Sequence, residues 1–132
     1  MDQSSRILLV NDDLYFSGRL VSILRKLGFD VVIAGNSDDA ITSALAIRPS
    51  LIIVNLNSVK LGGIGLIRKL KDEIGDSRIL AFLSHTRIPE VRQEVLAAGA
   101  DSICANSAIT MRLPDLVRAL LEGRSLKPED EE

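Results

Sequence analysis

Short runs of aliphatic residues alternate along this chain with longer segments in which apolar residues recur at helical spacing. The alternation occurs five times, and the short runs cover residues 7–10, 31–34, 51–54, 79–83 and 103–105. Because nearly every residue in these runs is apolar, we expect strands of a parallel sheet that is covered on both faces.

Each longer segment carries one apolar stripe of the kind that packs a helix against a sheet. The five stripes consist of Leu20, Val21, Leu24 and Leu27; Ala40, Ile41, Ala44 and Leu45; Leu66, Ile67, Leu70 and Ile74; Val91, Val95 and Ala98; and Leu116, Val117, Leu120 and Leu121. We expect Gly28, Gly99 and Gly123 to end the first, fourth and fifth helices. Ser37 is expected to cap the second helix and Pro49 to bar its continuation. The pattern predicts an α/β fold of five βα units.

The length and the charge narrow the class of protein. The chain has 132 residues, 46% of them hydrophobic and 26% charged, as in one globular domain. We expect residues 1–123 to form this domain and residues 124–132 to be an acidic, disordered tail. The formal net charge of -2 gives the chain no overall positive potential that would attract polyanions. We therefore expect neither nucleic acid nor a membrane surface as a partner. No apolar run approaches the ~18 residues of a membrane span, and a cytoplasmic localisation is predicted.

Polar residues follow four of the five predicted strands, at the edge where open α/β sheets hold their ligands. They are Asn11, Asp12 and Asp13 after the first strand, Asn55 and Asn57 after the third, Ser84, His85 and Thr86 after the fourth, and Asn106 and Ser107 after the fifth. Most of these side chains are neutral, so this edge is polar but short of charge.

Three stretches of the chain together resemble the bacterial response-regulator receiver domain of two-component systems. They are ILLVNDD at residues 7–13, RPSLIIVNL at residues 48–56 and AAGAD at residues 97–101. The resemblance covers Arg6 to about Gly123. It implies a doubly wound parallel sheet with the flavodoxin-like strand order 2-1-3-4-5, and a part in phosphorelay signalling that is not enzymatic.

The resemblance also implies which positions carry the chemistry. Receivers use a carboxylate after the third strand as the phosphate acceptor, two acids after the first strand for Mg²⁺, a hydroxyl after the fourth strand and a lysine after the fifth. In this chain the acceptor position is Asn55, the acid positions are Asn11 and Asp12 with Asp13 beside them, the hydroxyl is Ser84, and the lysine position is Asn106. An amide forms no stable phosphoryl ester, so the pocket is expected to be degenerate, with no catalytic residue.

The neutral side chains also change the expected metal and switch chemistry. Mg²⁺ needs carboxylates to offset its dehydration, so we expect no metal or other cofactor, and at most weak Mg²⁺ binding through Asp12. The switch aromatic that often accompanies the hydroxyl in receivers corresponds to Ile103, which has no polar tip, so the usual readout between Ser84 and this position is not expected. Asparagines in place of two acids and one base remove charges that depend on one another, which favours a permanently set conformation.

Simpler structural roles are open to several of these residues. Asp12 and Asp13 are also the carboxylates that a helix N-terminus favours, and this role competes with residual ion binding. Residues 57–58 and 62–63 are interpreted as a loop, because no lysine follows the glycines as in a phosphate-binding loop. His85 is interpreted as a loop histidine.

The favoured hypothesis is a phosphorylation-independent pseudo-receiver. It would bind a protein partner or a second copy, as a possible homodimer, through the face of the fourth helix, fifth strand and fifth helix. One alternative is a response regulator that accepts phosphate on a non-standard residue, Asp12 or Asp13. A less favoured alternative is a flavodoxin-like binder of a small ligand, against which the chain has only three Phe, one Tyr and no Trp.

Overall fold

The computed structural model describes residues 6–124 and contains one parallel sheet. Its strands lie in the order β2-β1-β3-β4-β5. They are β1 (Arg6–Val10), β2 (Asp30–Ala34), β3 (Leu51–Asn55), β4 (Arg78–Leu83) and β5 (Ser102–Ala105). The predicted strands and the flavodoxin-like strand order are thereby confirmed.

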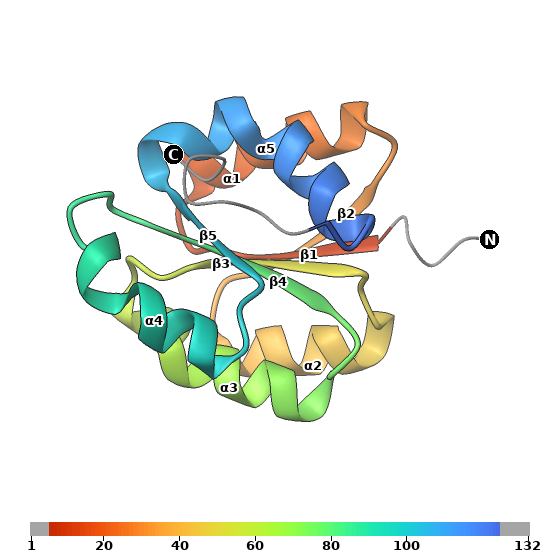
Figure 1. Ribbon diagram of the computed structural model, residues 1–132. Coiled ribbons are helices and arrows are strands. Elements are labelled where there is room, and N and C mark those ends of the chain that lie inside the picture. The colour runs from red at the N-terminus through yellow and green to blue at the C-terminus, as the bar shows by residue number, and fades with distance from the viewer. Residues whose placement is uncertain (1–5, 125–132) are drawn as a thin grey trace.

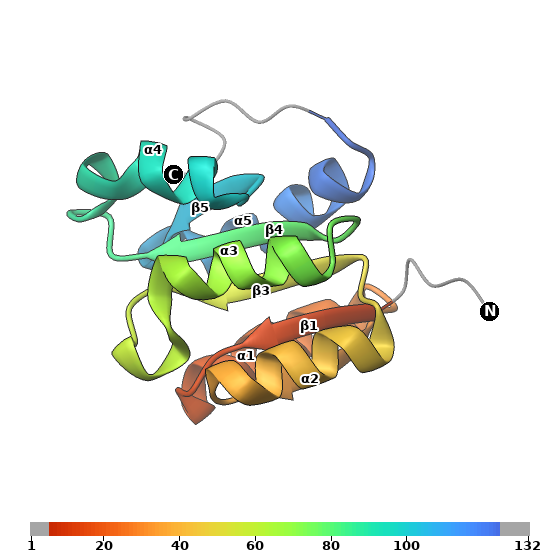
Figure 2. The same ribbon diagram turned by 90° about the horizontal axis from the view of Figure 1, so that it is seen from below.

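Five helices cover the two faces of the sheet. They are α1 (Leu14–Lys26), α2 (Ser37–Ile47), α3 (Gly63–Glu73), α4 (Ile88–Ala98) and α5 (Asn106–Leu121), and a short 3-10 helix, η2 (Val59–Leu61), precedes α3. Figure 1 shows α1 and α5 on one face and α2, α3 and α4 on the other. Figure 2, seen from below, shows the second group in front of the strands. The fold is therefore doubly wound, as predicted.

The central strands send alternate side chains into two apolar cores, one on each face. In β1, Leu8 and Val10 enter the core beneath α2, α3 and α4, whereas Ile7 and Leu9 enter the core beneath α1 and α5. All four side chains have no exposed surface. Burial on both faces explains why the central strands read as continuous aliphatic runs.

The edge strand β2 departs from the predicted burial on both faces. Val32 is 37% exposed and Ile33 is 46% exposed in this strand, whereas the other edge strand, β5, is buried throughout. The apolar run predicted the strand correctly but could not show that it lies at the edge. Two residues of the predicted helical stripes, Leu27 and Leu45, are also exposed, each by 40%.

The ends of the helices follow the predicted signals with one correction. Gly28, Gly99 and Gly123 have the positive φ angles that favour glycine at helix ends. The cap of α2 is Asn36 and not Ser37, because the Asn36 side chain accepts a hydrogen bond from the backbone N–H of Asp39. The helix ends at Ile47, two residues before Pro49, as predicted.

The predicted acidic tail lies outside the described residues apart from Arg124. Within residues 6–124, none of the helices has the length and apolar character needed to cross a membrane.

Candidate functional site

The register of the parallel strands brings two asparagines to the same edge of the sheet. Val10 of β1 pairs with Val54 of β3, so the next residues in each chain segment, Asn11 and Asn55, lie side by side. Asn55 in turn is paired with Phe82 of β4. The positions that resemble the first metal-binding acid and the phosphate acceptor therefore do meet in space, as neutral amides.

These two amides are buried and hydrogen-bonded to each other. Asn55 Nδ2 donates to Asn11 Oδ1 at 2.7 Å, and the residues are 6% and 2% exposed. Asn11 Nδ2 donates in turn to the backbone oxygen of Asp13 at 3.1 Å and to Ser17 Oγ at 2.9 Å. The side chain of Asn11 thus connects the end of β1 to the first turns of α1.

Asn57, which we interpreted as part of a loop, bonds through its side chain to three other residues of the site. Its backbone N–H and its Nδ2 both donate to Asn55 Oδ1, at 2.7 and 2.8 Å. Its Nδ2 also donates to Asn106 Oδ1 at 2.9 Å, and its Oδ1 accepts from the backbone N–H of Ser84 at 3.0 Å. The one sequence signal for this role was its place among the polar residues that follow the third strand.

Two backbone N–H groups fix the orientation of the hydrogen-bonded asparagine side chains, that is, which end of each amide is the oxygen and which is the nitrogen. The N–H of Asn57 requires an oxygen at Asn55 Oδ1, and the N–H of Ser84 requires an oxygen at Asn57 Oδ1. Asn55 Nδ2 must then point at Asn11, which has to present its oxygen. Because a carboxylate has no donor, the network selects an amide at position 55 on hydrogen-bonding grounds alone.

The two carboxylates beside this network have other partners. Asp13 is the N-cap of α1, where its Oδ1 accepts from the backbone N–H of Phe16 at 3.1 Å. Asp12 Oδ2 accepts from Ser58 Oγ at 2.6 Å, which ties the loop after β1 to the loop after β3. Both residues are exposed. Asp13 therefore takes the helix N-terminal role that was one of its two interpretations.

The remaining predicted positions lie at the ends of β4 and β5. The hydroxyls of Ser84 and Thr86 are 3.1 Å apart in the loop between β4 and α4, and the exposed His85 lies between them in sequence. Ile103 is fully buried and pairs with Ala81 of β4. Asn106 is the first residue of α5, so the position that resembles the receiver lysine is near the asparagine network.

Receiver domains commonly bind Mg²⁺, and the donor atoms of this pocket fit such an ion poorly. The oxygens of Asn11 and Asn55 are neutral and already accept hydrogen bonds from amide nitrogens. The Asp12 and Asp13 carboxylates each accept a hydrogen bond of their own. Within residues 6–124, no three His, Cys, Asp or Glu side chains are grouped so that they could hold a metal. A hard cation would have to displace several of these bonds without gaining a third carboxylate.

A pocket of about 450 Å³ opens over the network. It is lined by Asp13, Phe16, Asn55, Asn57, Phe82 and Asn106. The rings of Phe16 and Phe82 have centroids 5.4 Å apart and form an apolar wall beside the amides. The pocket thus has the position expected for a ligand site in this fold, at the carboxyl ends of the strands.

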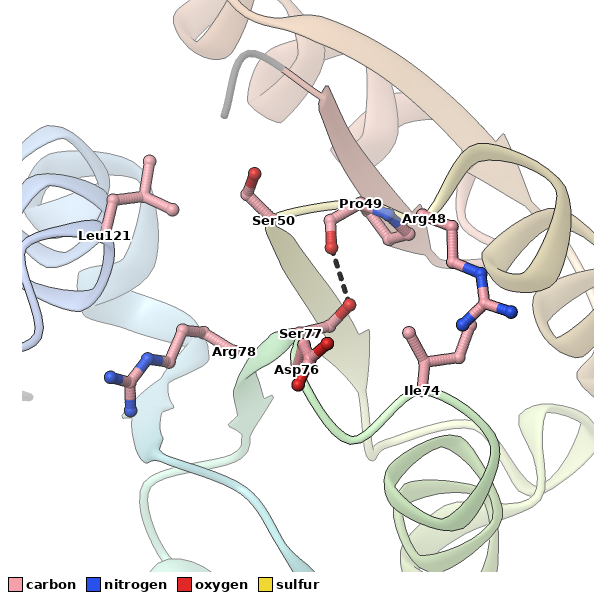
Figure 3. Close-up of a pocket in the computed structure, with 8 residues that line it drawn as sticks. All are labelled: Arg48, Pro49, Ser50, Ile74, Asp76, Ser77, Arg78 and Leu121. Carbon is pink, nitrogen blue, oxygen red and sulfur yellow. Dashed lines mark hydrogen bonds between the residues drawn. The ribbon is translucent and has the colours of Figure 1, made fainter. Parts of the chain in front are cut away.

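A second pocket, of about 430 Å³, lies at the opposite edge, by the amino ends of β3 and β4 (Figure 3). Its lining includes Arg48, Asp76 and Arg78, which carry charges of both signs. Arg78 forms an ion pair with Asp101 at 3.2 Å, and Ser77 Oγ donates to the backbone oxygen of Pro49. Arg78 and Ser77 thus have partners within the chain, and none of the predicted site residues lines this pocket.

Comparison of this chain with known proteins finds response regulators and their receiver domain. The model of the response regulator receiver domain matches residues 7–117. The transcriptional regulatory protein PrrA of Mycobacterium tuberculosis is 30% identical over 121 residues, which are 92% of this chain and 52% of PrrA. The DNA-binding response regulator MtrA of the same species is 28% identical over 125 residues, which are 95% of this chain and 54% of MtrA. The chain therefore spans about half the length of these curated relatives.

Solved structures agree with the family model. A LuxR-family two-component response regulator from Aurantimonas sp. SI85-9A1 has a TM-score of 0.83 and 27% identity, with 96% of this chain and 92% of that chain covered. A response regulator from Burkholderia pseudomallei, solved with a phosphorylated aspartic acid, calcium and citrate, has a TM-score of 0.72 and 27% identity. That match covers 90% of this chain and 69% of the other.

These relatives correct the prediction about partners and establish the family. The exclusion of nucleic acid was wrong, because MtrA is a DNA-binding response regulator and PrrA a transcriptional regulatory protein. The net charge of a segment that spans half of such a protein says nothing about the other half. With the family model matched from Ile7 to Val117, this chain belongs to the response regulator receiver domain family.

Proposed function

We propose that this member of the receiver family signals independently of phosphorylation, through non-covalent contacts in a two-component context. One observation carries the proposal. The side chain at the acceptor position, Asn55, is a buried amide whose nitrogen donates to Asn11 and whose oxygen accepts two hydrogen bonds from Asn57. Neither atom is available to attack a phosphoryl group.

The neighbouring positions support the same proposal. An acyl phosphate forms when a carboxylate attacks phosphorus while cations neutralise the phosphoryl oxygens. At this site the positions that would supply a second metal-binding carboxylate and the lysine are Asn11 and Asn106, both neutral. Restoring one charge alone therefore leaves the others uncompensated, whereas the neutral amides at these positions are linked through Asn57 in one hydrogen-bond network.

A non-standard acceptor is the alternative that the geometry favours less. Asp13 uses one oxygen to cap α1, and Asp12 accepts a hydrogen bond from Ser58. Each carboxylate lies after β1, so a phosphoryl donor would have to approach from a different direction than at the end of β3. Attack in line is disfavoured when the reacting group is not positioned for it.

The test is intact-protein mass spectrometry after incubation with acetyl phosphate and Mg²⁺. We expect the wild-type chain to gain no phosphoryl group. The Asn55→Asp variant probes the acceptor position alone, and the triple variant Asn11→Asp/Asn55→Asp/Asn106→Lys is the positive control, because it restores the two acids and the lysine together. A stoichiometric phosphoryl adduct on the wild type that hydroxylamine removes, as it removes an acyl phosphate, would refute the proposal, and Asp12→Asn and Asp13→Asn variants would then locate the acceptor.

A further inference from the structure

The side chain of Asn57 joins three segments of the chain at or just beyond the last paired residues of β3, β4 and β5. Its nitrogen donates to Asn55 at the end of β3 and to Asn106 at the start of α5. Its oxygen accepts from the backbone N–H of Ser84 in the loop that leads to α4. Asn106 lies 49 positions from Asn57 in the sequence, and Ser84 lies 27 positions from it. One exposed side chain thus connects β3, the β4–α4 loop and α5.

The same three segments carry the receiver positions that deal with a phosphoryl group. By the family pattern the acceptor lies at Asn55, the hydroxyl at Ser84 and the lysine at Asn106. In a phosphorylated receiver the phosphoryl oxygens would be the acceptors that these groups approach. Here the lysine position presents an oxygen instead, and the Asn57 amide supplies both the nitrogen that this oxygen needs and the oxygen that the Ser84 N–H needs.

We infer that the Asn57 side chain is a built-in substitute for the phosphoryl group, a positioning residue that holds the β4–α4 loop against β3 and α5 without covalent modification. The inference rests on the proposed function, because it describes how the site keeps one conformation when no phosphoryl group is transferred to it. It also explains why position 106 is asparagine. A lysine there would place an ammonium donor against the Asn57 nitrogen, which is a donor too.

Only an amide at position 57 satisfies all of these contacts. In the Asn57→Asp variant one carboxylate oxygen still accepts from Ser84, while the other faces the oxygens of Asn55 and Asn106. In the Asn57→Ala variant every side-chain contact is lost. The two variants therefore separate the bond to the β4–α4 loop from the bonds to β3 and α5.

Amide hydrogen exchange of the complete chain, resolved by residue with NMR, tests this inference. For Asn57→Ala we expect the Ser84 amide to exchange about three- to tenfold faster, the factor that corresponds to loss of one net hydrogen bond. For Asn57→Asp we expect a smaller increase at Ser84, since the acceptor remains.

The matched control is Asn36→Ala, which also removes an exposed asparagine with two side-chain hydrogen bonds, both to Asp39. Asn36 precedes α2, next to the edge strand β2, so its loss should leave Ser84 exchange unchanged. Wild-type exchange at Ser84 in Asn57→Ala, or an equal increase in Asn36→Ala, would overturn the inference. Failure of the proposed function has a different signature, namely a phosphoryl group gained by the wild-type chain in the mass spectrum.

Discussion

Replacing the amide at the acceptor position by a carboxylate should destabilise this domain, although the two side chains have the same shape. In the wild type, Asn55 Nδ2 donates to Asn11 Oδ1 at 2.7 Å in a buried environment. The Asn55→Asp variant puts a second oxygen at that distance. Asn11 cannot turn over to help without giving up its bonds to Asp13 and Ser17, since its nitrogen makes both.

The size of the destabilisation in Asn55→Asp follows from the hydrogen-bond donor that is lost and from the two acceptor oxygens that then face each other. A net hydrogen bond is worth about 1 kcal/mol, and a buried polar group left without its partner costs about 1–3 kcal/mol. The free energy of unfolding should therefore fall by roughly 2–4 kcal/mol at neutral pH. The cost is large beside a total stability of about 5–15 kcal/mol for a domain of this kind.

The destabilisation should depend on pH with a definite sign. Protonation gives the introduced carboxyl an O–H that can donate to Asn11, so its pKa in the folded variant lies above the ordinary value of about 3.9. A carboxyl whose folded-state pKa is raised favours the folded state as it becomes protonated. The difference from wild type is therefore full above the folded-state pKa and shrinks as the pH falls through it.

Urea unfolding of both proteins at neutral pH and near pH 4 measures this difference. The control is Asn36→Asp, the same substitution at an exposed helix cap. Its carboxylate still accepts from the Asp39 N–H, and the lost bond to the Asp39 carboxylate is screened by solvent, so the stability should change by less than about 1 kcal/mol. An Asn55→Asp variant as stable as wild type at neutral pH would refute the hydrogen-bond argument. A penalty that grew toward acid pH would contradict its sign.

Three further predictions concern the backbone, the core and the metal. Arg48 has the left-handed φ of 48°, so Arg48→Gly should raise the stability by about 0.5–1 kcal/mol, and a thermal melt that is unchanged or lower would contradict this. Ile53→Ala should cost about 2–5 kcal/mol in urea unfolding, because Ile53 is fully buried in β3. The half-exposed Ile33→Ala in β2 is the matched case and should cost less than half as much. In calorimetric titration with Mg²⁺, the wild type should show no saturable binding at concentrations where Asn11→Asp/Asn55→Asp/Asn106→Lys binds, and equal binding by the two would contradict the poor fit of the donor set.

The nucleic-acid question shows where reasoning from composition fails. Net charge describes the field of the residues that were counted, and the relatives named as DNA-binding or transcriptional regulators are about twice as long. The prediction that the receiver pocket is degenerate did not depend on the net charge. It depended on the identity of single side chains at Asn11, Asn55 and Asn106, which the sequence states directly.

The sequence by itself determined the elements and the chemical character of the site. Hydrophobic periodicity is a local property, so it located five strands and five helices, and the order of polar residues placed the asparagines after the strands. Sequence signals for helix capping were less reliable where two adjacent residues can both act as the N-cap. Asn36 and Ser37 are both good cap residues, and which of them caps α2 depends on the backbone geometry at the start of the helix.

Only the tertiary structure decided how far each edge strand is exposed and which amide bonds to which. Val32 and Ile33 are exposed in the edge strand β2, whereas the other edge strand, β5, is buried throughout, and the aliphatic residues of β2 do not indicate this difference. The bonds from Asn55 to Asn11 and from Asn57 to Asn106 join residues 44 and 49 positions apart. Strand register brings these residues together, and two backbone N–H groups then orient the amides. Because hydrogen bonds are directional and short, the network exists only once the sheet has closed around it.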